Sequence, residues 1–373
     1  MEAFSIAILL VSFLLLLSIG TPVAWSITIS SLFTLLVSVP FLPALTTISQ
    51  RMATGIDSFA LLAIPFFILS GELMNKGGVA HRLVAFAKSL VGFLPGGLAL
   101  INVISAMLMG SVAGSAMASA SAMGSILGPE MEKEGYSKGF GVAINITSAT
   151  TGLVIPPSNI LIVYSLASGG ASIAALFLAG YIPGILTGLF LMAVAMIWAK
   201  KKNFKTGKRA PLKIVFNSFV RAFPSLMLLF VVIGGIVSGV FTATEASAIA
   251  VIYTLVLGFV YKEITVKTLP SILLKSSTTT AIVMFLIGAS MSMSWVLSYE
   301  NIPEMISSGI LSLSDNKIVI LLLINFTLLF VGIFMDMTPA VLIFTPIFLP
   351  IVTQLGIDPV HFGIIMILNL CIG

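Results

Sequence analysis

The sequence predicts an all-α polytopic membrane protein that contains two repeats with broken helices. Of its 373 residues 58% are hydrophobic and only 8% are charged, and the mean hydropathy is +1.18. Soluble domains carry about 25% charged residues, so this chain cannot cover its own surface in water and lipid must be its solvent. The repeats are indicated by a pattern that recurs on both sides of a basic central loop.

Ten apolar stretches predict the helices, since a spanning helix needs about 20 mostly apolar residues. The first begins without the basic segment and cleavage site of a signal peptide, so we expect a membrane helix there. Two of the regions that lack any charge are the 41 residues of 89–129 and the 61 residues of 139–199. The first can hold a helical hairpin that enters and leaves on one side, and the second must hold at least two crossings. In order, the stretches are 3–19, 22–42, 58–73, 90–127, 140–199, 223–261, 278–299, 318–335, 339–352 and 361–373.

Seven of the 18 basic residues lie in one short loop, between Lys200 and Lys213. Lys and Arg in short loops stay cytoplasmic, so this loop is expected inside the cell. The clustering explains the net charge of +5 without a nucleic-acid partner. The loop serves as a topology anchor, or alternatively recognises lipid or a partner.

An internal repeat is centred on that loop. We expect residues 1–205 to form the first repeat, with scaffold helices, a hairpin at about 98–128 and a broken helix at about 140–165. Residues 206–373 form the second, with a hairpin at about 318–352. Such repeats, often inverted, are typical of secondary transporters. The second repeat stops where the first continues, so we expect a C-terminal truncation. An offset of 221 residues pairs Thr21 with Thr242, Ser26 with Ser247, Pro129 with Pro350, Gly135 with Gly356 and Gly152 with Gly373.

Enzymatic and metal sites lack their usual parts. Cys371 is the only cysteine and the only histidines are His81 and His361, which excludes a disulfide framework and a Cys-based zinc site within one chain. Neither a nucleophile elbow nor a Walker-type phosphate loop occurs. We therefore expect no enzyme, no catalytic residue and no ATP-driven pump.

A run of small and polar residues, 110–121, interrupts the first uncharged region. Small residues let backbones approach closely, so the run can form a hairpin tip whose carbonyl groups ligate a cation. The alternative is helix packing, because Gly110 and Gly114 form the small-residue motif of membrane helix interfaces.

Two consecutive prolines, Pro156 and Pro157, predict a broken helix. Proline lacks an N–H donor and disfavours helical backbone in the preceding residue, so the helix should unwind between Gly152 and Pro157. Asn, Thr and Ser side chains are frequent in 145–159 and supply hard oxygen donors. A broken helix directs carbonyl groups at a cation and amides at an anion, whereas a simple proline kink is the alternative.

Asp336 lies between two apolar runs, and the 221-residue offset aligns it with Ser115. An ionisable residue within a membrane segment is by default a functional hypothesis, and the alternative is a loop carboxylate at the interface. Glu245 is a weaker candidate that is more typical of a helix start. Since 89–129, 139–199 and 318–373 contain no Lys or Arg, an anionic substrate would be held by bound cations, helix N-termini and hydroxyl groups.

An ordered set of motifs covers nearly the whole chain. It is similar to the large membrane subunit (M, DctM-like) of the tripartite ATP-independent periplasmic (TRAP) transporters, within the ion transporter superfamily. The motifs are DSFALLAIPFFILSG at 57–71, GG at 77–78, PGG at 95–97, GSA at 114–116, IPPS at 155–158, GIFMD at 332–336 and TPIFLP at 345–350.

This resemblance implies an elevator-type secondary transporter, in which a mobile transport domain with two re-entrant hairpins moves against a scaffold. It implies sodium as the coupling ion, with no cofactor and no other metal. The implied partners are a small membrane subunit (Q), a periplasmic substrate-binding protein (P), the lipid bilayer and a small organic anion. Family members usually continue past the position of Gly373, and no helix precedes Met1, so the Q subunit is expected as a separate polypeptide.

The resemblance also implies two sodium sites. Tip 111–115 and the broken helix 145–158 form one, and tip 336–339 and a broken helix beginning at Asn369 form the other. The expected substrate contacts are Ser115, Thr151, Ser158, Asn159 and Thr338. The expected sodium-binding residues are Ser111, Gly114, Ser115, Asn145, Ser148, Gly152, Pro156, Asp336, Thr338, Asn369 and Gly373.

We therefore expect a sodium-coupled permease subunit in the bacterial inner membrane that imports an organic acid, such as a C4-dicarboxylate, a sialic acid or a sugar acid. One alternative is a stand-alone sodium- or proton-coupled carboxylate carrier of the same superfamily. Another is a non-transporting membrane scaffold subunit.

Overall fold

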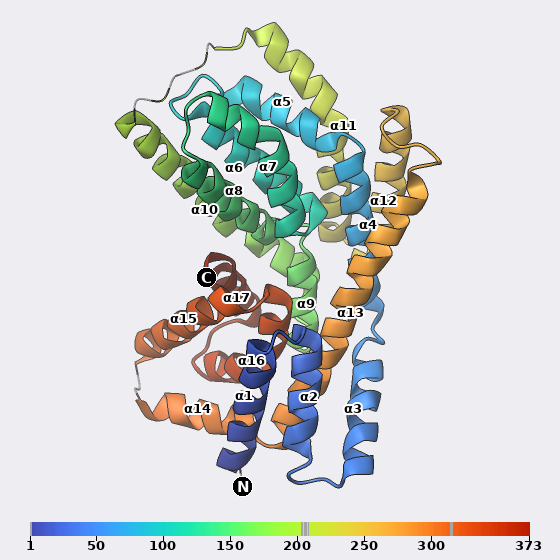
Figure 1. Ribbon diagram of the computed structural model, residues 1–373, viewed down its shortest axis with the longest axis vertical. Coiled ribbons are helices and arrows are strands. Elements are labelled where there is room, and N and C mark those ends of the chain that lie inside the picture. The colour runs from blue at the N-terminus through green and yellow to red at the C-terminus, as the bar shows by residue number, and fades with distance from the viewer. Residues whose placement is uncertain (1, 203, 205–206, 208, 314–315) are drawn as a thin grey trace.

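The computed structural model describes residues 2–202, 204, 207, 209–313 and 316–373, and this part of the chain contains helices and no strand (Figure 1). Seven of the described helices are long and apolar enough to cross a membrane, or eight if one bent pair counts as a span. The prediction of an all-α polytopic membrane protein is confirmed. Of the predicted basic loop, Lys205 and Lys208 lie outside the described residues.

The helices before the central loop include one short 3-10 helix, η1, which leads into α4. They are α1 (Glu2–Ser18), α2 (Val23–Leu35), α3 (Phe41–Gly55), η1 (Phe59–Leu62), α4 (Ala63–Lys76), α5 (Val79–Val91), α6 (Gly97–Ala113), α7 (Ala116–Lys133), α8 (Lys138–Val154), α9 (Asn159–Ala167) and α10 (Ile173–Lys201).

The helices after the loop include the longest of the described helices, the 31-residue α13. They are α11 (Leu212–Val237), α12 (Ala243–Val260), α13 (Leu269–Tyr299), α14 (Ile302–Leu313), α15 (Lys317–Phe334), α16 (Met337–Gln354) and α17 (Pro359–Ile372).

Helices α2, α3 and α4 pack against α13, and α12 packs against α4. Together they form one side of the molecule, which we call the scaffold. Helix α12 packs along α4, and the Thr244 hydroxyl donates to the Phe59 carbonyl at 2.9 Å. At the start of α12 the Thr242 hydroxyl accepts from the Glu245 amide, while the Glu245 carboxylate accepts from the Thr242 amide. This capping box confirms the prediction that Glu245 starts a helix.

Two helical hairpins lie in opposite halves of the molecule (Figure 1). Helices α6 and α7 form the first, which packs against α8, and α15 and α16 form the second, which packs against α17. Helix α16 also contacts α13 and α9. The second hairpin therefore connects the scaffold to the region where α8 is broken.

The break in the first unit is shorter than the sequence indicated. Helix α8 stays helical through Gly152 and ends at Val154, and α9 leaves at a bend of 52°. The expected start of the unwinding at Gly152 is therefore wrong. The non-helical segment is 155–158, and it begins at Ile155, which lies directly before the first proline and has extended backbone with φ −82° and ψ 124°.

Candidate functional site

Both hairpin tips line one cavity of about 660 Å³. The first tip contributes Gly114 and Ser115, the second contributes Asp336 and Thr338, and α9 contributes Asn159. The opposite wall comes from α4, α13 and the start of α2 with its N-cap, Pro22. Its lining residues are Pro22, Val23, Ala24, Trp25, Ile64, Ile68, Thr279, Ile282, Val283, Phe285 and Leu286.

The first tip is a two-residue turn that requires a glycine. Gly114 has left-handed backbone (φ 59°), and a Cβ atom there would lie 2.6 Å from Asn159 Nδ2. The close approach places the tip directly against the start of α9. Ser115 begins α7 as its N-cap, where its hydroxyl accepts from the Ala118 amide at 3.3 Å.

The second tip is built in the same way with a carboxylate. Asp336 is the N-cap of α16, and its Oδ1 atom accepts from the Thr338 amide at 3.0 Å. A carboxylate at a helix N-terminus is stabilised by the helix dipole. Among the described lining residues Asp336 is the one ionisable group, so the cavity carries negative charge and no Lys or Arg.

Helices α6 and α8 meet backbone to backbone through glycines. A Cβ on Gly110 would lie 2.8 Å from the Gly152 Cα. For Gly110 and Gly114 the sequence left two roles open, helix packing and a hairpin tip. In the structure Gly110 packs against α8, and Gly114 forms the hairpin tip. Asn102 of α6 donates to Asn145 Oδ1 of α8 at 3.3 Å. Asn145 Nδ2 in turn donates to the Ala120 carbonyl of α7 at 2.8 Å.

Helices α15 and α17 repeat both features, the close glycine contact and the asparagine hydrogen bond. A Cβ on Gly332 of α15 would lie 3.0 Å from the Gly373 Cα, and Asn369 donates to Asn325 Oδ1 at 2.7 Å. The expected broken helix beginning at Asn369 is wrong over the described residues. Asn369 lies inside α17, whose N-cap is Asp358, and its amide also donates to the Ile365 carbonyl.

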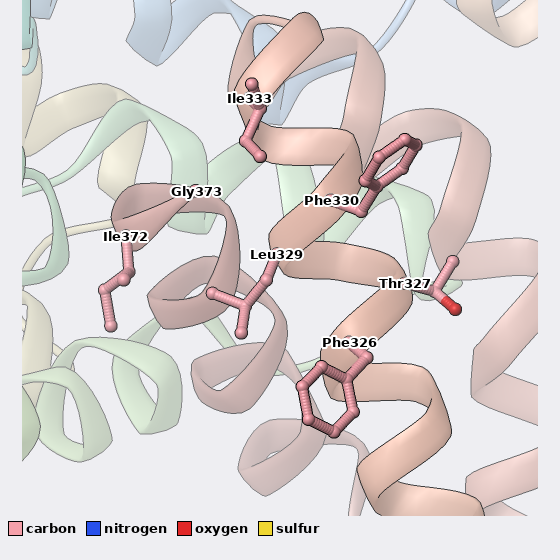
Figure 2. Close-up of a pocket in the computed structure, with 7 residues that line it drawn as sticks. All are labelled: Phe326, Thr327, Leu329, Phe330, Ile333, Ile372 and Gly373. Atoms are coloured by element: carbon pink, nitrogen blue, oxygen red, sulfur yellow. The ribbon is translucent and has the colours of Figure 1, made fainter.

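Beside this contact the surface is hollowed along α15 (Figure 2). The side chains of Phe326, Phe330 and Ile333 project from α15, and Ile372 and Gly373 belong to the end of α17. The lining offers one hydroxyl, that of Thr327, and is otherwise apolar. These outward-facing apolar side chains are suited to lipid and offer little to an ion.

The residues expected from the sequence fall into two groups. Gly114, Ser115, Asn159, Asp336 and Thr338 come together around the cavity. The others do not line it. They are Ser111, Asn145, Ser148, Thr151, Gly152, Pro156, Ser158, Asn369 and Gly373.

Most hydroxyl groups in the second group are engaged within their own helices. Ser111 donates to the Leu108 carbonyl, Ser148 to the Ile144 carbonyl and Thr151 to the Ser148 carbonyl. Ser158 differs, because its hydroxyl is buried and has no hydrogen-bond partner within the described part of the chain. Ser158 occupies the N-cap position of α9 without a side-chain capping bond, and it directly precedes the cavity residue Asn159.

Sequence reasoning missed two classes of residue. Asn102 and Asn325 were overlooked, although each is an isolated asparagine in an apolar stretch, which is the available signal. The scaffold wall was also missed, including Trp25, whose ring lies 5.1 Å from that of Phe285, and Thr279. Its contacts join residues more than 200 positions apart, and no local pattern reports them.

The polar groups that line the cavity are mainly oxygen donors. The described residues contain no group of three His, Cys, Asp or Glu side chains that could hold a metal ion. The cavity offers hydroxyl, amide and carboxylate oxygen together with the backbone of two hairpin tips, and hard cations prefer such oxygen ligands.

A polytopic helical membrane fold with two hairpin tips at one internal cavity defines a membrane transporter. The chain belongs to the DctM component family of the tripartite ATP-independent periplasmic transporters, whose family model matches residues 10–373.

Curated relatives agree with this family. The chain is 56% identical to the uncharacterized protein YgiK of Salmonella typhimurium, over 99% of this chain and 85% of that protein. It is 40% identical to the C4-dicarboxylate TRAP transporter large permease protein DctM of Pseudomonas aeruginosa, over 85% of this chain and 74% of that protein. In fold it is similar to the YdaH transporter of Alcanivorax borkumensis, with TM-score 0.61 and 15% identity over 90% of this chain and 78% of that one.

Proposed function

We propose that the chain is the sodium-coupled permease subunit of a system that imports an organic acid. The observation that supports this most directly is the shared cavity, where two hairpin tips meet and Asp336 is the one ionisable lining residue within the described chain. Its volume of about 660 Å³ lies within the usual 300–1,000 Å³ of small-molecule sites.

An organic anion entering this cavity meets helix N-termini and no basic side chain. The N-caps of α7 and α16, Ser115 and Asp336, line the cavity, and the first residue of α9, Asn159, lines it as well. Helix N-termini carry partial positive charge that favours anions. The Asp336 carboxylate opposes an anion, so a bound cation beside it is needed to offset that repulsion. Sodium binding therefore precedes or accompanies substrate binding.

The two walls of the cavity support movement of one unit against the other. The hairpin side supplies the polar groups, whereas the scaffold side supplies mainly apolar side chains from α2, α4 and α13. A mainly apolar wall makes few directional bonds and lets the hairpin unit slide. We propose that the two hairpins with α8, α9 and α17 form the mobile domain of an elevator.

The substrate class and the partners come from the family. The Pseudomonas relative is named for C4-dicarboxylates, and we propose a carboxylate of that kind, a sialic acid or a sugar acid. A small membrane subunit and a periplasmic binding protein would complete the system in the bacterial inner membrane. The alternatives are a stand-alone carrier of the same superfamily and a non-transporting scaffold subunit.

Uptake into proteoliposomes tests this function. The acid is identified first, as the one in a panel of organic acids that raises the melting temperature of the cognate binding protein. Labelled acid is then supplied with the binding protein and both membrane subunits under an inward sodium gradient. We expect accumulation that collapses when potassium replaces sodium. Equal uptake without the binding protein would favour a stand-alone carrier, and no uptake in any condition would favour a scaffold.

A further inference from the structure

A second polar cavity, of about 770 Å³, lies outside the transport site. It is bounded by the α4–α5 turn, by α11 and by the α12–α13 turn, at the end of the molecule where α10 ends and α11 begins, on either side of the central loop (Figure 1). Because that loop is rich in Lys and Arg, this end is expected at the cytoplasmic surface. The cavity therefore lies near the level of lipid headgroups.

Its charged lining is predominantly basic. The lining contains three Lys or Arg side chains and one carboxylate. They are Lys76, Arg82, Arg221 and Glu263. Arg82 is partly engaged, with its guanidinium 3.7 Å from the Tyr261 ring centroid and 3.9 Å from Glu263 Oε1. Neither Lys76 nor Arg221 has an ion pair within the described chain, so two positive charges in the lining lack a counter-ion.

Two buried polar atoms in the lining also lack partners. Asn75 Oδ1 and Tyr261 Oη have no hydrogen-bond partner within the described chain. A buried polar group without a partner costs about 1–3 kcal/mol, so a ligand that supplies one is favoured. Tyr261 can donate to an anion, and Asn75 can accept from a hydroxyl group.

The N-terminus of α5 opens at the same place. Gly78 caps it with left-handed backbone (φ 68°), and Gly78 and His81 both line the cavity. A Cβ on Gly78 would lie 2.7 Å from Arg82 Nη1. The glycine thus allows Arg82 to fold back over the turn and donate to the Gly78 carbonyl at 2.8 Å. The free amides of a helix start add to the attraction for an anion.

We propose that this cavity binds a phosphate group, either in the headgroup of an anionic phospholipid or in a small soluble phosphate. Arg221 and Lys76 neutralise the phosphate, Tyr261 donates to it and Asn75 accepts from a headgroup hydroxyl. The apolar side chains of Val220 and Phe223, exposed beside Arg221 on α11, are placed to contact acyl chains. Basic pockets between membrane helices bind anionic headgroups elsewhere.

Melting of the purified chain in detergent tests this proposal with three probes, dioleoyl phosphatidylglycerol, dioleoyl phosphatidylcholine and inorganic phosphate. We expect a saturable rise in melting temperature with phosphatidylglycerol and little with phosphatidylcholine. Replacing Lys76 and Arg221 with Gln should raise the apparent Kd for phosphatidylglycerol roughly 25-fold, from about fivefold for each cation lost.

A matched control separates this site from general surface charge. Lys213→Gln removes a charge from the same end of α11 without touching the lining, and its Kd should be unchanged. Protection by inorganic phosphate as well would assign the site to phosphate in general, and protection by phosphatidylglycerol alone would assign it to lipid. Equal protection by both lipids with none by phosphate, or equal losses in the double variant and the control, would overturn the proposal. Native mass spectrometry of lipid adducts gives the same comparison if a variant melts too low.

Discussion

Ser115 and Asp336, 221 residues apart, occupy equivalent places in the two hairpins. Each is the N-cap of the second helix of its hairpin, and each accepts a hydrogen bond from a backbone amide of the first turn, at 3.3 Å and 3.0 Å. Both line the same cavity. The carboxylate present in one tip and absent from the other makes the cavity electrostatically asymmetric, with negative charge on the second hairpin.

The contact between Gly110 and Gly152 should tolerate no side chain. Gly110→Ala places a methyl group 2.8 Å from backbone, and overpacking of this kind typically costs 1–3 kcal/mol. We expect a lower melting temperature in detergent and reduced uptake.

Gly234→Ala is the matched control for that change. Gly234 lies inside α11 with nothing within 4 Å of an added Cβ. Since alanine is favoured over glycine in a helix by about 1 kcal/mol, this variant should melt at the same or a higher temperature. Equal destabilisation by both substitutions would contradict a close α6–α8 contact.

The hydrogen bond between Asn325 and Asn369 should appear as a coupling energy. We expect a double-mutant cycle with alanine at both positions, measured by unfolding in mixed micelles, to give about 0.6 kcal/mol, the mean for interhelical bonds in membranes. A cycle of Asn369→Ala with Thr327→Ala serves as the control. Thr327 lies on α15 like Asn325, but its hydroxyl donates to the Leu323 carbonyl of that helix. Coupling of the same size in the control cycle would remove the special role of Asn325.

Local chemistry explains why much of the fold could be predicted from the sequence. The paired prolines at Pro156 and Pro157 ended α8, and polar residues after apolar runs produced caps at Ser115 and Asp336. The offset of 221 residues aligns Ser115 with Asp336 in the sequence. The helix end and the caps depend on residues within one or two turns of one another, whereas the offset depends on a pattern that recurs along the sequence.

The remaining site residues depend on contacts that no local pattern encodes. Trp25 and Thr279 line the cavity because α2 and α13 pack together. Asn102 of α6 donates a hydrogen bond to Asn145 of α8. Ser148 and Thr151 were predicted as ligands in an oxygen-rich segment. In the structure their hydroxyls donate to carbonyls of their own helix. A hydroxyl-rich helix can thus resemble a binding site in sequence while its donors are already used.

A cysteine placed in the cavity should report its occupancy. The one cysteine, Cys371, is buried, and burial suppresses its reactivity. Thr279 lines the cavity, whereas the neighbouring exposed Thr278 does not. We expect maleimide labelling of Thr279→Cys to slow when sodium and the transported acid are added together. Labelling of Thr278→Cys should stay constant. Slower labelling of both variants would indicate a global conformational change and not occupancy of the cavity.

We propose that a cation binds beside Asp336. Melting of the detergent-purified chain in sodium chloride, compared with potassium and choline chloride at equal ionic strength, tests it most directly. A ligand that binds only the folded state stabilises it by about 2.7 kcal/mol at 100 times its Kd, so we expect a saturable rise specific to sodium. Asp336→Asn should abolish this rise. Asp358→Asn should retain it, because Asp358 caps α17 by the same chemistry but does not line the cavity. A sodium-specific rise that survives in Asp336→Asn, or no difference between the salts at concentrations up to molar, would contradict a sodium site at the second hairpin tip.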